Sequence, residues 1–239
     1  MRGLGTLVNV ATIVVGTGVG VAVAGRLPER TRATVLTGIG LVVLAVGVES
    51  FLETRNAVFP IVSVAVGGLL GDALRIEDRL ADLGTWLRER FVARAAGNGQ
   101  DGRRAAGPFV EGFVTASLLF CIGPLTILGS FDDGVRGDPQ LLVVKAALDG
   151  VVALAYAATY GIGVGFSALV VGGVQTGLTL VAVAVGDVLT DRMVAELTAT
   201  GGVLVLGIGL RLLDLKRIPV ASYLPGLVLA PVLVALFAR

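Results

Sequence analysis

The residues most able to do chemistry are an ionisable pair, Lys145 and Asp149, inside a long apolar segment. The two are four residues apart, so on a helix they share one face, and Tyr156 continues that face. An ionisable side chain at the centre of a membrane costs on the order of 2.5–3.5 kcal/mol, so each one needs a reason. One interpretation is a site for an ion, a proton or a charged substrate. The alternative is a structural pair in which Lys145 extends to the membrane surface.

A helix break lies in the preceding apolar segment, at Gly123 and Pro124. Proline has no backbone N–H, so it interrupts the helix and leaves upstream carbonyls without partners, which a cavity tolerates and lipid does not. Cys121 comes just before the break. Because the chain has no histidine to act as a base, we expect Cys121 to be a packed side chain rather than a nucleophile. Glu111, near the start of the segment, either faces the cavity or caps the helix at the interface.

Two amide side chains, Asn9 and Gln175, also fall inside apolar segments. By default, such a residue makes a hydrogen bond to a neighbouring helix. In a transporter, both amides would instead line the site around Asp149.

Membrane-spanning helices must position these residues. Of the 239 residues, 55% are hydrophobic and 15% are charged, and the mean hydropathy is +0.90. Soluble domains carry about 25% charged residues, and a helix that crosses a membrane needs about 20 mostly apolar ones. We therefore predict an all-α, polytopic protein of the cytoplasmic membrane, embedded in the lipid bilayer. Its eight expected spans are 4–24, 34–52, 57–74, 110–130, 141–160, 164–186, 194–213 and 221–238.

The longest polar stretch is 75–107. In its first part, 75–94, apolar residues recur close to a 3.6-residue period, which predicts an amphipathic helix on the membrane surface with Trp86 at headgroup depth. Residues 95–107 are predicted to form a linker. The excess of Lys and Arg in 75–107 places this stretch in the cytoplasm and both chain ends outside. If segment 110–130 dips in and returns on the same side, the spans number seven and the C-terminus lies inside.

A shift of 162 residues aligns 27–48 with 189–210, and Gly40/Gly202 and Gly47/Gly209 are among the identical pairs. Chance similarity between helices rich in Gly, Val and Leu is the alternative to a duplication. Equivalent helices would lie five spans apart and point in opposite directions, so a duplication predicts an inverted repeat, as in secondary transporters. The expected organisation is then 1–74 (spans 1–3, first repeat), 75–107 (cytoplasmic helix and linker), 108–160 (spans 4 and 5) and 161–239 (spans 6–8, second repeat).

Several function classes are excluded by composition. The formal net charge is +1 and no basic block stands out, so nothing indicates a nucleic-acid partner. With no His and a single Cys, one chain cannot build a Cys–His zinc site, a disulfide framework or a Ser–His–Asp triad. No phosphate-binding loop is present. We therefore expect no cofactor, no metal and no enzymatic activity.

Five blocks of the sequence resemble the YqgA/YdfK-type family of bacterial and archaeal inner-membrane proteins, which is named as a domain of unknown function. The resemblance covers essentially the whole chain, although the linker at 95–107 is longer than expected. It implies an integral membrane protein, often guessed to be a transporter, and names no substrate. The blocks are Gly5–Asn9, Phe109–Pro124, Ile127–Ser130, Lys145–Gly150 and Thr198–Gly202.

The leading hypothesis is a transporter or channel for a small ion or solute. Its midplane site would gather Lys145, Asp149 and Tyr156 against the helix break, and Asp149 would be the titrating group of a proton- or cation-coupled cycle. The alternative is a scaffold or sensor that does not transport and acts through the 75–94 helix. An intramembrane enzyme comes third, because the scattered carboxylates form no acid–base pair. Abundant small-residue helix faces also predict a homo-oligomer.

Overall fold

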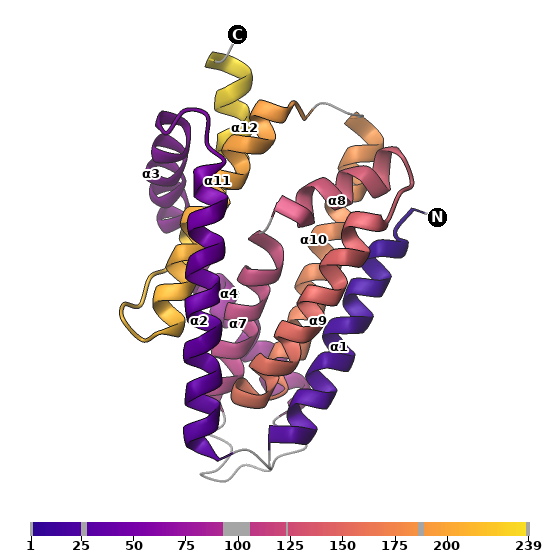
Figure 1. Cartoon of the computed structure of the whole chain (residues 1–239), viewed down its shortest axis with the longest axis vertical. Helices are drawn as coiled ribbons and strands as arrows, with labels where there is room; N and C mark the ends of the chain where they lie inside the picture. The colour runs from indigo at the N-terminus through magenta and orange to yellow at the C-terminus, as the bar shows by residue number, and fades with distance from the viewer. Residues whose placement is uncertain (1, 25–27, 93–105, 123, 186–188, 238–239) are drawn as a thin grey trace. The chain divides into compact units, whose positions relative to one another are not determined.

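The computed structural model describes residues 2–24, 28–92, 106–122, 124–185 and 189–237, and every regular element in these ranges is a helix (Figure 1). The predicted all-α class is confirmed. The helices are α1 (Leu4–Ala24), α2 (Glu29–Leu52), α3 (Val58–Ala73), α4 (Ile76–Leu87), the π-helix η1 (Arg88–Val92), α7 (Ala106–Ile122), α8 (Pro124–Val135), α9 (Gln140–Tyr160), α10 (Gly163–Val185), α11 (Asp191–Leu212), the 3-10 helix η2 (Val220–Tyr223) and α12 (Pro225–Phe237).

Among the described residues, six helices are long and apolar enough to cross a membrane, and the number rises to eight if two bent pairs each form one span. The pairs are α3 with α4 and α7 with α8. The predicted span at 4–24 matches α1, and the one at 141–160 matches α9 to within one residue. The predicted amphipathic segment is helical as α4 and η1. Most of the predicted linker lies outside the described residues, and its last two residues begin α7.

The chain divides into two compact units, and each takes elements from several parts of the sequence. Unit 1 comprises Met1–Leu36, Arg79–Cys121 and Leu125–Gly186, and so contains α1, α9, α10 and nearly all of α7 and α8. Unit 2 comprises Thr37–Asp78, Ile122–Pro124 and Asp187–Arg239, and so contains most of α2 together with α3, α11 and α12.

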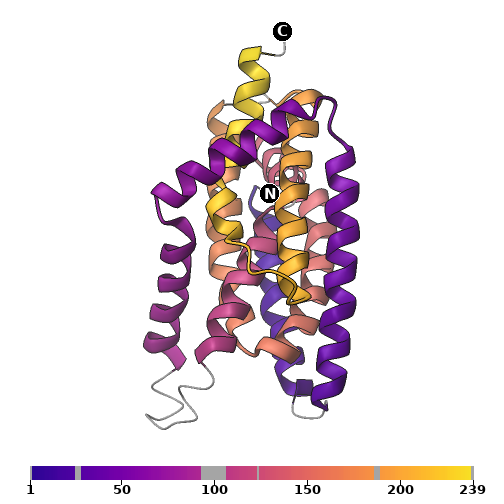
Figure 2. The ribbon, with the colours of Figure 1, turned by 90° about the vertical axis from the view of Figure 1, so that its left-hand side faces the viewer.

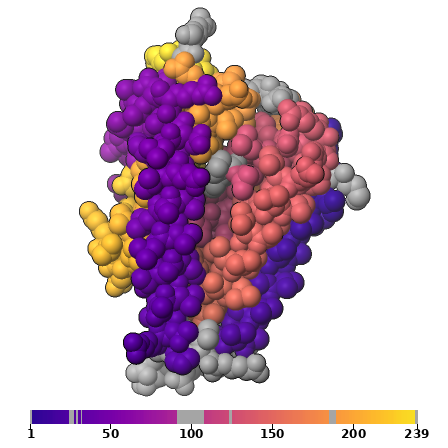
Figure 3. Space-filling model, in the orientation of Figure 1, coloured from indigo at the N-terminus to yellow at the C-terminus, as the bar shows by residue number. Residues whose placement is uncertain are grey.

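In unit 1, α1 and α9 run in the same direction and are in contact along their length (Figure 3). Small residues permit this approach, because Gly16 faces the carbonyl of Gly150 and Gly20 faces the carbonyl of Leu154, with no room for a Cβ at either glycine.

Helix α10 runs antiparallel to α1. A Cβ placed on Gly165 would lie 3.0 Å from Thr17 Cγ2, and one on Gly172 would lie 3.3 Å from Val10 Cγ2. The residue number therefore rises along one helix as it falls along the other. This alignment places Thr179 at the level of Gly3 and Gln175 at the level of Leu7.

The bent pair α7–α8 runs the full length of α9. A Cβ on Gly112, near the start of α7, would lie 2.6 Å from Tyr160 Cβ at the C-terminal end of α9. In α8, a Cβ on Gly129 would lie 2.9 Å from Leu142 Cγ at the opposite end of α9, and the Asp133 carboxylate binds the N–H of Gly3, just before α1. The two helices are bent by 58° at the break. This path runs from one end of α9 to the other, which favours a segment that crosses over one that returns on the same side.

In unit 2, α2 and α11 pack antiparallel and lie side by side (Figure 2). A Cβ on Gly47 would lie 2.8 Å from Leu206 Cγ, and one on Gly209 would lie 2.7 Å from Leu44 Cγ. The two contacts are equivalent under the 162-residue shift, because Gly47 corresponds to Gly209 and Leu44 corresponds to Leu206. The same holds for Gly40 against Leu213 and Gly202 against Phe51.

Candidate functional site

The centre of the candidate site is a cluster of three polar side chains from α1 and α9. Lys145, Asp149 and Asn9 are all buried, with exposed fractions of 4%, 8% and 0%. Lys145 Nζ and Asn9 Nδ2 both donate to the same oxygen, Asp149 Oδ2, and the Asn9 bond is 3.0 Å long. The predicted pair therefore forms on one face of α9, and the amide predicted to accompany it comes from α1.

One acceptor oxygen in this cluster remains without a donor, because Asn9 Oδ1 is buried and has no hydrogen-bond partner. A buried acceptor normally has a partner, because leaving it unpaired costs about 1–3 kcal/mol. The cluster can therefore accept a cation or a hydrogen-bond donor from a small ligand.

Helix α7 covers Lys145 with an aromatic ring. Lys145 Nζ lies 5.9 Å from the centre of the Phe120 ring, a distance that allows a cation–π interaction. Phe120 itself is two residues from the end of α7, beside the half-buried Cys121. The last turn of α7 that belongs to unit 1 thus contacts the ionic cluster through Phe120.

One backbone carbonyl before the break has a hydrogen-bond donor from the residues after it. The sequence predicted free carbonyls upstream of Pro124, but the hydroxyl of Thr126 donates to the Phe120 carbonyl over 2.9 Å. A hydroxyl two residues after the proline thus replaces the missing N–H. Pro124 begins α8, whereas Gly123, predicted as part of the site, lies outside the described residues.

Tyr156 extends the polar face of α9 away from the ionic cluster. It is fully buried, its hydroxyl has no hydrogen-bond partner, and its ring meets Tyr160 edge-on at a centroid distance of 6.1 Å. Tyr156 comes seven residues after Asp149, which is about 10 Å along the helix axis. Tyr156 therefore lies on the same face of α9 as Asp149 but is too far along the helix to contact it.

Glu111 lies apart from the ionic cluster. It is half-buried, and its neighbour Gly112 packs on Tyr160 at the far end of α9, eleven residues beyond Asp149. That separation is about 16 Å along the helix axis. Of its two predicted roles, an interfacial position fits this placement better than contact with Asp149.

Gln175 lies on the α10 side of unit 1. It is fully buried, and neither Nε2 nor Oε1 has a partner. The antiparallel alignment of α1 and α10 places it within one helical turn of the level of Asn9. An amide can both donate and accept, so Gln175 can contact either end of a polar ligand.

Sequence reasoning did not select Asp133 as a site residue. Asp133 is fully buried in α8, whereas the adjacent Asp132 forms an ion pair with Arg136 on a more exposed face. Hydropathy and charge do not distinguish the neighbouring acids 132 and 133. The one available signal was the helical spacing from Ser130, which places Asp133 on the same face as that buried hydroxyl.

Unpaired polar atoms are concentrated in unit 1. Among the described residues, all of the buried side-chain nitrogens and oxygens without a hydrogen-bond partner lie there except Ser63 Oγ and Arg192 Nε. A polar group without a partner is costly in a bilayer unless it meets water or a ligand. The unit 1 residues concerned are Thr6, Asn9, Thr17, Thr115, Ser117, Ser130, Asp133, Tyr156, Thr159, Gln175 and Thr179.

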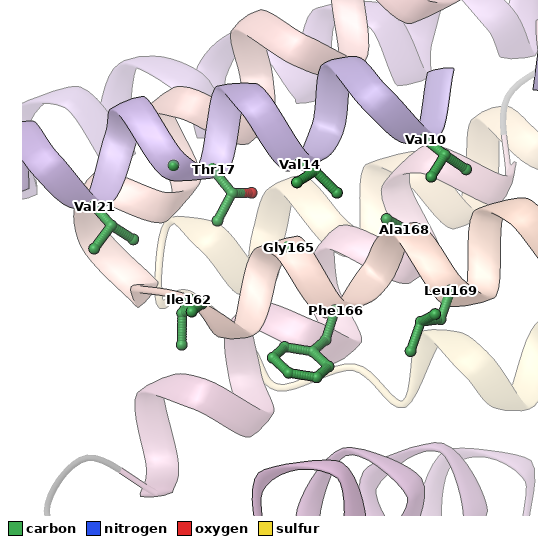
Figure 4. Close-up of a pocket in the computed structure, with 10 residues that line it drawn as sticks. Val10, Val14, Thr17, Val21, Ile162, Gly165, Phe166, Ala168 and Leu169 are labelled. Carbon is green, nitrogen blue, oxygen red and sulfur yellow. The ribbon is translucent and has the colours of Figure 1, made fainter. Parts of the chain in front are cut away.

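A groove of about 490 Å³ between α1 and α10 does not coincide with these charged groups (Figure 4). Its lining is apolar, with Val14 and Phe166 as examples, and Thr17 supplies its one hydroxyl. Within the described residues there is also no group of three or more His, Cys, Asp or Glu side chains that could hold a metal ion. The polar chemistry of unit 1 therefore centres on the Lys145–Asp149–Asn9 cluster.

Comparison with known proteins assigns the chain to a family. The model of the family described as "Protein of unknown function (DUF554)" matches residues 4–235, so the chain belongs to this family. It is 29% identical to the "Uncharacterized membrane protein YdfK" of Bacillus subtilis (strain 168), over 96% of this chain and 95% of the relative. It is also 29% identical to the "Uncharacterized protein YqgA" of Escherichia coli (strain K12), over 95% and 94% of the two chains. No solved structure matches. Together with the apolar helices, these matches identify a membrane protein, as the resemblance implied.

Proposed function

We propose that the protein is a transporter or channel for a small ion or solute in the cytoplasmic membrane, with its binding site at Asp149. The observation that carries the proposal is the buried Lys145–Asp149–Asn9 cluster, in which Asn9 Oδ1 has no partner. Unpaired polar atoms continue from this cluster through unit 1 along α1, α9 and α10.

A purely structural ion pair accounts less well for these contacts. Replacing a buried ion pair by well-packed apolar residues is often neutral or stabilising, so stability alone is a weak reason for such a pair. A structural pair also needs no unpaired amide beside it. A bound ligand would supply the missing partner of Asn9 Oδ1, because a cation or a donor group can approach Asp149 from the Asn9 side.

Lys145 is then the internal counter-ion of the site. When the site is empty, the ammonium group neutralises Asp149 and stays between the carboxylate and the Phe120 ring. An arriving cation or proton competes with Lys145 for the carboxylate. This competition couples site occupancy to the position of Lys145 beside the helix break.

An inverted repeat supports the same proposal. The contacts between α2 and α11 occur in reciprocal pairs under the 162-residue shift, and Val10 contacts Gly172, its own equivalent. Such reciprocity is expected from two copies of a motif related by a two-fold axis. In transporters built this way, the substrate site lies near the interface between the repeats. The two copies we infer are 1–74 and 161–239.

The test is flux in proteoliposomes that contain purified full-length protein, over a panel of cations, anions, small organic acids and amines. We expect a wild-type signal that Asp149→Asn reduces to the level of empty vesicles. The matched control is Asp82→Asn, a carboxylate exposed on α4, which should leave flux unchanged. Undiminished flux in Asp149→Asn would remove the site from the mechanism.

A second candidate function is a scaffold or sensor that acts through α4. The observation that favours it is the exposure of Leu83 and Trp86, at 41% and 55%, on a helix that also carries charged residues. Such a surface suits docking or lipid contact. If this function is correct, Trp86→Ala abolishes docking or lipid contact through α4 and leaves any flux unchanged, whereas Asp149→Asn does not affect that contact.

A further inference from the structure

A second buried carboxylate is Asp133 in α8. Its Oδ2 accepts a hydrogen bond from the Gly3 backbone N–H over 2.8 Å, and its Oδ1 is buried without a partner. Among the described residues, no Lys or Arg forms an ion pair with it. The adjacent Asp132, in contrast, pairs with Arg136 over 2.7 Å.

Helix capping accounts for only one of the two oxygens of the Asp133 carboxylate. A carboxylate oxygen that accepts an N–H at the start of a helix stabilises that helix, and Oδ2 does so for α1. The second oxygen contributes nothing to the cap. A fully buried carboxylate with one oxygen unpaired is costly, since a buried charge requires a compensating partner.

The two carboxylates bind α1 at different depths. Asp133 binds at Gly3 and Asp149 binds at Asn9, six residues apart, which is about 9 Å along the helix axis. Thr6 lies midway between them, and its buried hydroxyl has no partner. Unpaired oxygens thus occur at three successive levels along α1, from Asp133 of α8 and from Thr6 and Asn9 of α1 itself.

Helix α10 carries a second series of buried, unpaired polar side chains. A Cβ on Gly134, the residue after Asp133, would lie 2.6 Å from the Thr179 carbonyl, so Thr179 lies close to the level of Asp133. Gln175 lies one turn farther in the direction of Asn9. The side chains of both residues are buried and have no partners. The unpaired atoms of α10 thus follow those of α1 from Asp133 toward Asp149.

The ligand set indicates a monovalent cation. Carboxylate, hydroxyl and amide oxygens are hard ligands that suit alkali-metal ions rather than soft metals. A divalent ion would call for more negative charge, and in the described parts of the chain no group of three acids is found. One unpaired carboxylate matches one positive charge.

We propose that Asp133, with Ser130 and Thr179, forms an outer site for a monovalent alkali cation, from which the ion passes Thr6 and Gln175 to Asp149. This inference rests on the proposed transport function and names the substrate class and the entrance. Asp133 is loaded from the end of unit 1 where α1 and α9 begin. The ion then reaches Asp149 and displaces the Lys145 ammonium group from its carboxylate.

The test measures equilibrium binding of radioactive sodium and rubidium to the full-length protein in detergent, with N-methyl-D-glucamine as the replacement ion. Asp133→Asn keeps a carbonyl acceptor for the Gly3 N–H but removes the charge. We expect it to weaken binding of one of the two cations by about tenfold or more, a loss of about 1.4 kcal/mol. Asp132→Asn is the matched control and should leave binding unchanged. Ser130→Ala, which removes only a hydroxyl, should weaken binding less than Asp133→Asn does.

The outcomes separate the outer site from the proposed function. Asp149→Asn should abolish flux while the outer site still binds the cation, and the double variant with Asp133→Asn should bind none. If Asp133→Asn binds as wild type does, or if Asp132→Asn weakens binding as strongly, the outer site is wrong whatever the flux. If wild type binds no cation but carries an Asp149-dependent flux of an anion or neutral solute, the inference fails and the proposed function stands. If cation binding depends on Asp133 but no solute is transported, the proposed function fails, and with it the path from Asp133 to Asp149.

Discussion

Both units of this protein bury carboxylates, but they treat them differently. In unit 2, Glu196 is fully buried and accepts three hydrogen bonds, from Thr54 Oγ1 at 2.6 Å and from the backbone N–H groups of Arg55 and Asn56 at 2.9 Å each. The half-buried Glu77 binds Arg211 at 3.0 Å and the Ala221 N–H at 2.8 Å. In unit 1, Asp133 keeps an oxygen unpaired, and so does Asn9, the amide that donates to Asp149.

This difference distinguishes a structural carboxylate from one available to a ligand. Each of these two carboxylates holds a short helix-terminal segment, Glu196 just before α3 and Glu77 at η2, and both of its oxygens are used. A fully satisfied polar network rigidifies the structure around it. In unit 1, Asp133 and the amide bound to Asp149 retain acceptor capacity, which a fixed structural role does not require. The following variants test this comparison.

The largest effect is expected from breaking the Lys145–Asp149 pair. Lys145→Met leaves Asp149 buried and without its counter-charge, which typically costs 3–5 kcal/mol, so we expect a strong fall in thermal stability and loss of flux. The double variant Lys145→Met/Asp149→Asn should recover most of the stability but none of the flux. Thermal unfolding and proteoliposome flux measure the two effects. Recovery of flux along with stability would mean that the pair is structural.

Removal of the Glu196 side chain should have the opposite profile. Glu196→Ala deletes three hydrogen bonds of about 1 kcal/mol each, so we expect a loss of roughly 3 kcal/mol in stability. Flux per folded molecule should remain at the wild-type level. A variant that folds normally yet loses flux would place a functional carboxylate in unit 2.

Reciprocal glycines on α2 and α11 test the inferred repeat. Gly47→Ala and Gly209→Ala each place a Cβ under 3 Å from a leucine of the other helix, and such overpacking typically costs 1–3 kcal/mol. We expect similar losses of stability from the two changes. Gly38→Ala on α2 has no atom within 4 Å and is the matched control, with little or no loss. Unequal losses from the two reciprocal changes would argue against the two-fold relation.

Much of this arrangement follows from the sequence, because some features are local. Hydropathy located α1 and α9 almost to the residue, the four-residue spacing placed Lys145 and Asp149 on one buried face, and Pro124 marked the break between α7 and α8. Each of these depends on the properties of one helix.

Other features depend on contacts between distant segments and could not be predicted. Whether Asp132 or Asp133 is buried depends on how α8 packs against the start of α1, 130 residues earlier. Glu111 belongs to a segment that reaches the opposite end of α9 from the ionic cluster, and only the packing of Gly112 on Tyr160 reveals this. The hydroxyl of Thr126 satisfies the Phe120 carbonyl only because the chain bends at the break.

The smallest effect is expected from the surface of α4. Trp86 is 55% exposed, so Trp86→Ala should change stability by no more than about 0.5 kcal/mol and leave flux unaltered. Thermal unfolding and flux check both statements. A large loss of flux would shift the functional centre from the interior of unit 1 toward α4 and the alternative function.

The central claim, that the interior of unit 1 is a hydrophilic path, can be tested directly by cysteine accessibility. The chain has one cysteine, so Cys121→Ser gives a cysteine-free background. Thr6→Cys and Gln175→Cys should react with a charged, membrane-impermeant methanethiosulfonate. Thr200→Cys, at a position fully buried in unit 2, should not react. If Thr6→Cys and Gln175→Cys are as inert as Thr200→Cys, the interior of unit 1 is dry and the account is contradicted.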